Sequence, residues 1–154
     1  MNKSKLKNYK MENLDETSIQ LNILQNARVA TILFIFGCFL NFIEYDYSEK
    51  AIFQSMSNID KSVIRDNEIK AAVIAKYVSI IFLIAIIIFA DNAFTVFELN
   101  LSNIALDRTT ISSKSNKSNI QSSRIIALFD FLKVLGYFGA FIGYSLDLEN
   151  LENS

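Results

Sequence analysis

The sequence predicts an all-α integral membrane protein, a bundle of three transmembrane helices with long extramembrane helical extensions. Three apolar stretches predict it, at about 27–45, 71–97 and 125–146. At about 1.5 Å of rise per residue, each is long enough to cross a hydrocarbon core of roughly 30 Å. A soluble helical protein is the structural alternative. It is disfavoured because Ile80–Ala90 contains no polar residue and a chain this short has little that could cover it.

Composition removes several classes of function. The formal net charge of −1 makes no general case for nucleic acid as a partner. Histidine, the commonest metal ligand, is missing, and a single cysteine, Cys38, excludes an intramolecular disulfide and a cysteine-based metal cluster. The sequence has neither a glycine-rich phosphate loop nor a Ser/His/Asp set. We therefore expect no enzyme, no cofactor and no metal site.

Residues 1–26 are expected to form a basic, amphipathic segment on the cytoplasmic side. Their beginning is rich in lysine. Asp15 or Thr17 is suited to cap a helix, because its side chain can accept hydrogen bonds from free N–H groups. One side of that helix would be lined by Leu14, Leu21 and Leu24.

The first span, 27–45, is expected to remain uncleaved. Arg28 and the apolar run after it have the outline of a signal peptide, and Cys38 follows a weak lipoprotein-like cleavage box. However, the preceding segment is long for a signal peptide and no A-x-A-like site follows. Phe36 is also too bulky for its position in a lipoprotein box.

The connection to the second span carries apolar residues at helical spacing, namely Ile52, Met56, Ile59 and Val63. This pattern predicts either an amphipathic helix on the membrane surface or an extension of the second span. The extension is favoured because no Gly or Pro separates Ile52 from Phe97.

Beyond the second span, the helix is expected to continue to about Asp107. Residues 109–123 are rich in Ser and Asn, which predicts a flexible, solvated linker. The third span completes a membrane domain over 27–146, and 147–154 form a short acidic tail.

The distribution of Lys and Arg predicts a cell-membrane protein with its N-terminus inside and its C-terminus outside. The N-terminal segment and the second connection are basic, whereas the C-terminal tail has no Lys or Arg. The first connection argues the other way with Lys50, Lys61, Arg65 and Lys70, although acids are interleaved there. Amphipathic rings prefer the membrane interface, and tyrosines fall at the proposed outer ends, namely Tyr45, Tyr47, Tyr77 and Tyr144.

The polar residues of each span share one helical face. In the first span this face contains Ala30, Phe34, Gly37, Cys38, Asn41 and Glu44, opposite Ile32, Phe36, Phe39 and Ile43. In the second it is the line Val73, Lys76, Ile80, Ile84, Ile87, Asp91 and Glu98. In the third it contains Asp130, Lys133, Gly136, Ala140 and Gly143, opposite Leu128, Phe131, Leu135, Phe138 and Ile142. A charge left in lipid at mid-bilayer costs at least about 2.5–3.5 kcal/mol, so these faces should turn toward each other or toward a partner.

Charged residues of different spans that are expected at similar depths in the membrane fall into two groups. Asp91, Asp130 and Lys133 would form an intramembrane polar cluster, in which Lys133 forms a structural ion pair or serves transport. Glu44 and Lys76 would form an outer-side pair. The alternatives are that Glu44 and Lys76 extend to the interface, and that the second span ends early with Asp91 among the headgroups.

Small residues predict helix packing. Gly139-x-x-x-Gly143, with Gly136 one turn earlier, would let another helix backbone approach closely. Packing within the chain is favoured over self-association with a second copy. Gly37 is a further packing position, and Asn41 is expected to donate a hydrogen bond across helices.

These features favour a non-enzymatic accessory or interaction subunit, whose partners are the lipid bilayer and either another membrane protein or itself. The alternative is an oligomer that conducts ions or small solutes along Asp91, Asp130 and Lys133. A conducting path more often carries a ring of one charge sign, whereas here the signs are mixed. A membrane-embedded enzyme is disfavoured because no residue set presents a nucleophile with a base.

Overall fold

The computed structural model is an all-helical bundle, with no strand among the residues it describes. It describes the backbone of residues 3–57, 59–106 and 113–153, and the side chains of 17–57, 59–102 and 118–153. The helices are α1 (Lys3–Met56), α2 (Lys61–Leu106) and α3 (Ser113–Asn153). Each is long and apolar enough to cross a membrane.

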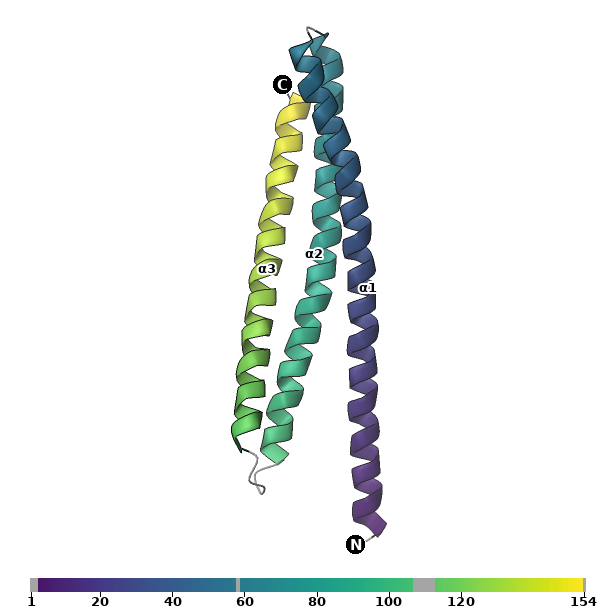
Figure 1. Cartoon of the computed structure of the whole chain (residues 1–154), viewed down its shortest axis with the longest axis vertical. Helices are drawn as coiled ribbons and strands as arrows, with labels where there is room; N and C mark the ends of the chain where they lie inside the picture. Colours follow the sequence, from purple (N-terminus) through teal and green to yellow (C-terminus); the bar gives the residue numbers. More distant parts are fainter. Residues whose placement is uncertain (1–2, 58, 107–112, 154) are drawn as a thin grey trace.

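Successive helices run antiparallel, so α1 and α3 point the same way and the two termini lie at opposite ends of the bundle (Figure 1). We call the end where α1 reverses into α2, at 57–60, the turn end. The other end, where the chain passes from α2 to α3, is the linker end. Figure 1 shows α1 moving away from α2 and α3 toward the linker end.

α2 is the central element. It packs along both α1 and α3, whereas the described backbones of α1 and α3 do not approach each other. A layer of aromatic rings at mid-height joins the side chains of the three helices. Phe82 of α2 stacks on Phe34 of α1, with 5.1 Å between ring centroids, and lies 5.7 Å from Tyr137 of α3. Phe34 and Tyr137 meet edge to face at 6.2 Å, so side chains join all three helices where the backbones do not.

Small side chains form most of the buried core. Buried alanines recur along the contact faces of all three helices, at Ala30, Ala51, Ala71, Ala75, Ala85, Ala90 and Ala127. Lipid is as apolar as leucine, so burying large apolar groups gives little gain in a membrane. Close backbone approach over small residues, with its dispersion contacts, holds such helices together instead.

Buried amides join α1 to α2 near both ends. At the turn end, Asn67 Nδ2 donates to Gln54 Oε1 at 2.8 Å. Toward the linker end, Asn92 Nδ2 donates to the backbone oxygen of Ile23 at 3.1 Å, and Asn92 Oδ1 accepts from Asn26 at 3.4 Å. Neither buried amide was singled out from the sequence, because Asn is frequent throughout this chain.

Arg65 of α2 forms hydrogen bonds with the C-terminal end of α3. Its guanidinium donates to the Leu151 carbonyl at 2.8 and 3.1 Å and to the Glu152 carbonyl at 3.2 Å. The last carbonyls of a helix lack partners within the helix and carry partial negative charge, so a cation there is favourable.

The structure at the turn end shows that the predicted extension of the second span back to Ile52 is wrong. Ile52 and Met56 belong to α1, and α2 begins only at Lys61. Asp60 sets this boundary, because its Oδ1 accepts from the Ser62 N–H at 3.1 Å and its backbone oxygen accepts from Val63. A cap can therefore separate two helices without Gly or Pro.

Two further boundaries differ from the prediction. α1 runs without a break from Lys3, so neither Asp15 nor Thr17 starts a helix. α3 begins at Ser113, so the expectation of a flexible linker is wrong for 113–123, while 109–112 lie outside the described residues. Ser123 shows why Ser is tolerated here. It is buried, and its hydroxyl donates to the carbonyls of Asn119 and Ile120 within the same helix.

Candidate functional site

The predicted lipid-facing sides of the first and third spans are exposed in the structure. On α1 these residues are Ile32, Phe36, Phe39 and Ile43, and on α3 they are Leu128, Phe131, Leu135, Phe138 and Ile142. On the opposite side of α1, Ala30 and Gly37 are buried against α2 as expected, but Cys38 is exposed. Cys38 follows Gly37 by one residue, and the rotation of the helix between them places it outside the contact with α2.

The predicted polar line of the second span does not face the interior. Its members Ile84, Ile87, Asp91 and Glu98 are exposed. The buried arc of α2 consists instead of Ala71, Ala75, Val78, Ser79, Ala85, Ile86, Ala90 and Asn92. The reason is that α2 packs against two helices at once, so it buries the side with the smallest residues.

The predicted charge cluster is only partly assembled. Lys133 Nζ lies 2.7 Å from Asp130 Oδ1, an ion pair one turn apart on α3. The Asp130 side chain is 14% exposed and that of Lys133 is 57% exposed. Asp91 enters no ion pair among the described side chains, because it lies on the exposed line of α2. The structure therefore brings together an acid and a base, but not the second acid.

The predicted outer-side pair is not formed. Glu44 Oε1 accepts from the Ser48 hydroxyl at 2.9 Å, and no ion pair among the described residues joins Glu44 to Lys76. Lys76 is half-buried on the same line of α2 as Ile84 and Asp91.

The glycines fall into two groups. A Cβ added to Gly37 would collide with the ring of Phe82, so this glycine permits the close approach of α1 to α2. A Cβ added to Gly136, Gly139 or Gly143 would meet nothing within 4 Å. The prediction that these three glycines pack α3 within the chain is therefore wrong, because no other helix of the described residues lies against them. Asn41 is half-buried on α1, and the predicted hydrogen bond from it to another helix is not formed among the described residues.

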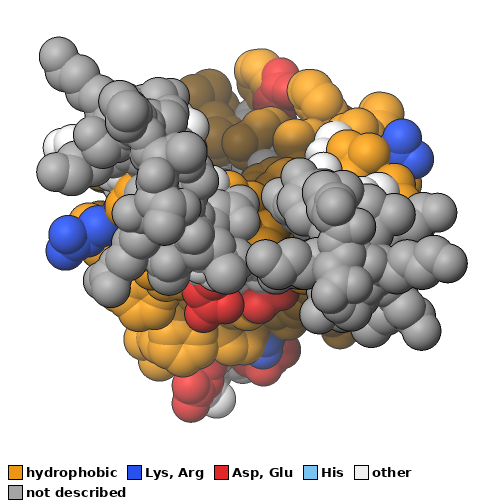
Figure 2. Space-filling model, turned by 90° about the horizontal axis from the view of Figure 1, so that it is seen from below, with side chains coloured by type: hydrophobic (Ala, Val, Ile, Leu, Met, Phe, Trp, Pro, Cys, Tyr) orange, Lys and Arg blue, Asp and Glu red, His pale blue; other side chains and the backbone are white. Residues whose placement is uncertain are grey.

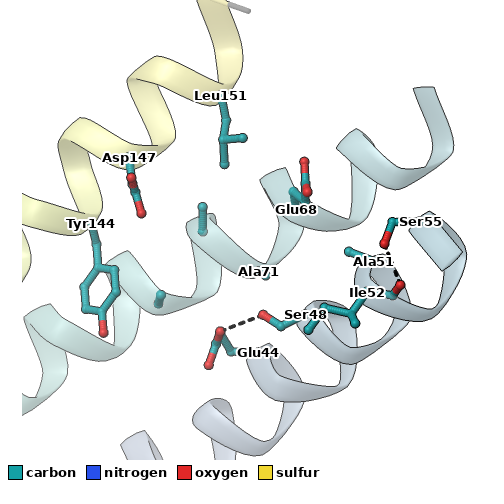
Figure 3. A pocket seen from close by; sticks show the side chains of 12 residues that line it. Glu44, Ser48, Ala51, Ile52, Ser55, Glu68, Ala71, Tyr144, Asp147 and Leu151 are labelled. Carbon is teal, nitrogen blue, oxygen red and sulfur yellow. Dashed lines mark hydrogen bonds between the residues drawn. The ribbon is translucent and has the colours of Figure 1, made fainter. Parts of the chain in front are cut away.

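An acidic groove of about 340 Å³ lies near the turn end and was not predicted (Figure 3). Each helix contributes one carboxylate to its lining, Glu44, Glu68 and Asp147. Tyr144 and Ala71 also line this groove (Figure 3). The three acids are not arranged to hold a metal ion. Only the packing of three helices shows that these acids share one groove, because they lie far apart in the sequence.

Comparison with protein families, with curated proteins and with solved structures gives no match to this chain. Function is therefore argued from the geometry of the bundle.

Proposed function

We propose that this chain is a non-enzymatic accessory subunit that spans the cell membrane three times and binds another membrane helix through α3. The binding face contains the glycines Gly136, Gly139 and Gly143 together with Lys133. The partner is a helix of another membrane protein or of a second copy.

The observation that carries this proposal is an open glycine stripe next to a charge at mid-height. Lys133 is one turn from Tyr137, which belongs to the ring layer near the middle of the spans. Lipid contact with an ammonium group at that depth is unfavourable by at least about 2.5–3.5 kcal/mol. A partner helix seated on the glycines would cover Lys133 and bring its own polar groups to it.

The proposed orientation places the N-terminus inside and the C-terminus outside. An odd number of crossings is supported by the termini lying at opposite ends of the bundle (Figure 1). The basic N-terminal segment and the absence of Lys and Arg from 147–154 support the direction.

The test is association between two differently tagged copies, and cross-linking to other proteins, in native membranes. We expect a complex that Gly139→Leu or Gly143→Leu weakens at least tenfold, because the added side chain keeps the partner backbone away. Cys38→Leu is the matched control, since it enlarges a small exposed residue on α1. A complex unchanged by both glycine substitutions would contradict the proposal.

The conducting oligomer makes a different prediction. Purified, folded protein in liposomes would pass ions, and Asp91→Asn would change the flux without unfolding the protein. Under the accessory proposal, the wild-type protein and the Asp91→Asn variant both give no flux above empty liposomes.

A further inference from the structure

The side of α2 that points away from α1 and α3 is uncovered within the chain. We call it the open face of α2. Its residues recur at intervals of three and four, and so lie on one side of the helix, namely Tyr77, Ile80, Ile84, Ile87 and Asp91. All are exposed except Ile80, which is half-buried. Viewed from the linker end, hydrophobic side chains reach the outside of the bundle on more than one side (Figure 2). The chain therefore has two uncovered faces, the open face of α2 and the binding face of α3.

One antiparallel register relates α2 to α3 along their length. Pairs of residues that share a groove or a ring contact mark it at three levels, namely Ala75 with Tyr144, Phe82 with Tyr137, and Val96 with Ser123. Copies of the chain that are inserted in the same orientation have these residues at the same depths. The register therefore also shows which residues of one copy lie level with those of a neighbouring copy.

In this register the bulky residues of the open face of α2 lie level with small residues of the binding face of α3. Tyr77 is within one residue, about 1.5 Å of rise, of the level of Gly143. Ile84 is equally close to the level of Gly136. A large side chain seated over a glycine of another helix gains dispersion contacts and lets the two backbones approach closely. The two faces are therefore complementary in size.

The charges of the two faces are complementary as well. Ile87 is within one residue of the level of Lys133, and Asp91 lies one turn, about 6 Å, further toward the linker end. Helical side chains lean toward the N-terminus of their helix, so Lys133 leans toward the linker end and Asp91 toward the turn end. These directions and the flexible four-carbon stem of lysine reduce the offset. Among the described side chains, Lys133 is bonded to Asp130 alone and Asp91 enters no ion pair.

We infer that copies of this chain assemble through unlike faces, with the binding face of α3 in one copy packed on the open face of α2 in the next. Lys133 then lies between Asp130 of its own helix and Asp91 of the neighbouring copy, so the charge cluster that one chain does not assemble forms between two. A two-fold contact between α3 helices would instead place two Lys133 side chains together at one depth, where like charges repel.

Because the two faces differ, the contact is heterologous, and its repetition gives a ring or a row of copies rather than a closed pair. The inference rests on the proposed function and names a second copy as the partner of the binding face.

Disulfide cross-linking in native membranes tests which faces meet. In a Cys38→Ala background, one tagged copy carries Ile80→Cys and a differently tagged copy carries Ala140→Cys, at levels within one residue of each other. We expect an oxidant to join the two copies when they are co-expressed, and neither variant to cross-link with itself. Phe36→Cys in place of Ile80→Cys is the matched control. Phe36 is exposed on α1 near the same level, two residues from the ring contact of Phe34 with Phe82, and should stay unlinked.

Association between the tagged copies measures the charge contact. Asp91→Asn and Lys133→Gln should each weaken it about threefold to fifteenfold, the range of polar contacts between membrane helices. The double variant should lose little more than either single variant, because both changes remove the same contact. In the unfolding of a single chain the two changes stay additive, because the two side chains lie on different faces. Glu49→Gln is the matched control, since it removes an exposed acid of α1 near the turn end and should leave association unchanged.

Other results would overturn the inference. Cross-linking of Ala140→Cys with itself would show that α3 meets α3, and independent effects of the two charge substitutions on association would show that Asp91 and Lys133 do not meet. A complex of the binding face with a different protein, without association between copies, would also overturn it but leave the proposed function standing. A folded protein that forms neither kind of complex would overturn both.

Discussion

Asn92 uses both ends of its side-chain amide, donating to Ile23 and accepting from Asn26, and it is buried between α1 and α2. Asn67 and Gln54 form the corresponding bond near the turn end. Such interhelical bonds average about 0.6 kcal/mol in membranes, so their main effect is to select one register of α1 against α2. Each ion pair among the described side chains lies within a single helix. Unlike the buried amides, these pairs therefore do not select the register of one helix against another.

The ion pair on α3 gives a prediction about charge coupling. Lys133→Leu should leave Asp130, whose side chain is mostly buried, without its partner and destabilise the fold by about 1–3 kcal/mol. Asp130→Asn should recover part of this loss in the double variant. Asp91→Asn should combine with Lys133→Leu additively, because Asp91 lies on the exposed line of α2.

Thermal unfolding in detergent with a double-mutant cycle measures both couplings. An interaction energy near zero for Asp130 and Lys133, or a clear one for Asp91 and Lys133, would show that the ion pair of α3 is not what holds Lys133.

At the scale of elements, the boundary between α1 and α2 shows how one side chain ends a long helical pattern. Asp60 accepts the Ser62 N–H and so satisfies a donor at the start of α2. The opposite case is α3, which continues back to Ser113 through a segment rich in Ser and Asn. Low helix propensity is only a weak preference there, and packing of Ser123 and Ala127 against α2 overrides it.

Asp60→Ala should therefore destabilise the start of α2 by about 1 kcal/mol, the usual effect of losing an N-cap. Glu49→Ala is the control, since Glu49 is exposed within α1 and the change should be nearly neutral. Hydrogen exchange of the amides of residues 61–64 reports the effect locally. Equal exchange in the two variants would mean that the cap does not define this helix start.

At the scale of the whole molecule, α2 lies between α1 and α3, whose described backbones do not approach each other and whose rings Phe34 and Tyr137 meet at mid-height (Figure 1). This arrangement leaves an acidic groove near the turn end and an apolar groove near the linker end, both open between α1 and α3. It also leaves the glycine stripe of α3 without a neighbour. Parts of the helix surface therefore stay uncovered by the other helices of the chain.

The proposed orientation predicts where the ends of the chain are accessible. In a Cys38→Ala background, Asn153→Cys should react with a membrane-impermeant thiol reagent added to intact cells. Ser4→Cys should react only after the membrane is opened. The reverse pattern would invert the proposed topology, and labelling of both sites in intact cells would contradict three crossings.

Two kinds of feature could be read from the sequence, namely the apolar helical segments and the bulky faces of the first and third spans. Both follow from hydropathy and helical period, and Phe36, Phe39, Leu135 and Phe138 are exposed as predicted. The buried face of α2 could not be read in this way. In a bilayer the outward side of a helix is as apolar as the inward side, so polarity does not distinguish lipid contact from helix contact.

Tertiary structure alone decided which residues meet. It placed Gly37 against Phe82 but left Gly139 open, although both are glycines within apolar helices. It left Asp91 exposed and outside the predicted cluster, whereas the pair of Lys133 with Asp130 follows from their spacing of one turn along α3. The sequence by itself determined that there are three long apolar helices and which bulky faces of the first and third spans are exposed. Their rotation and register depended on close contact between small residues of distant segments, a property of surface shape that residue spacing along one helix does not contain.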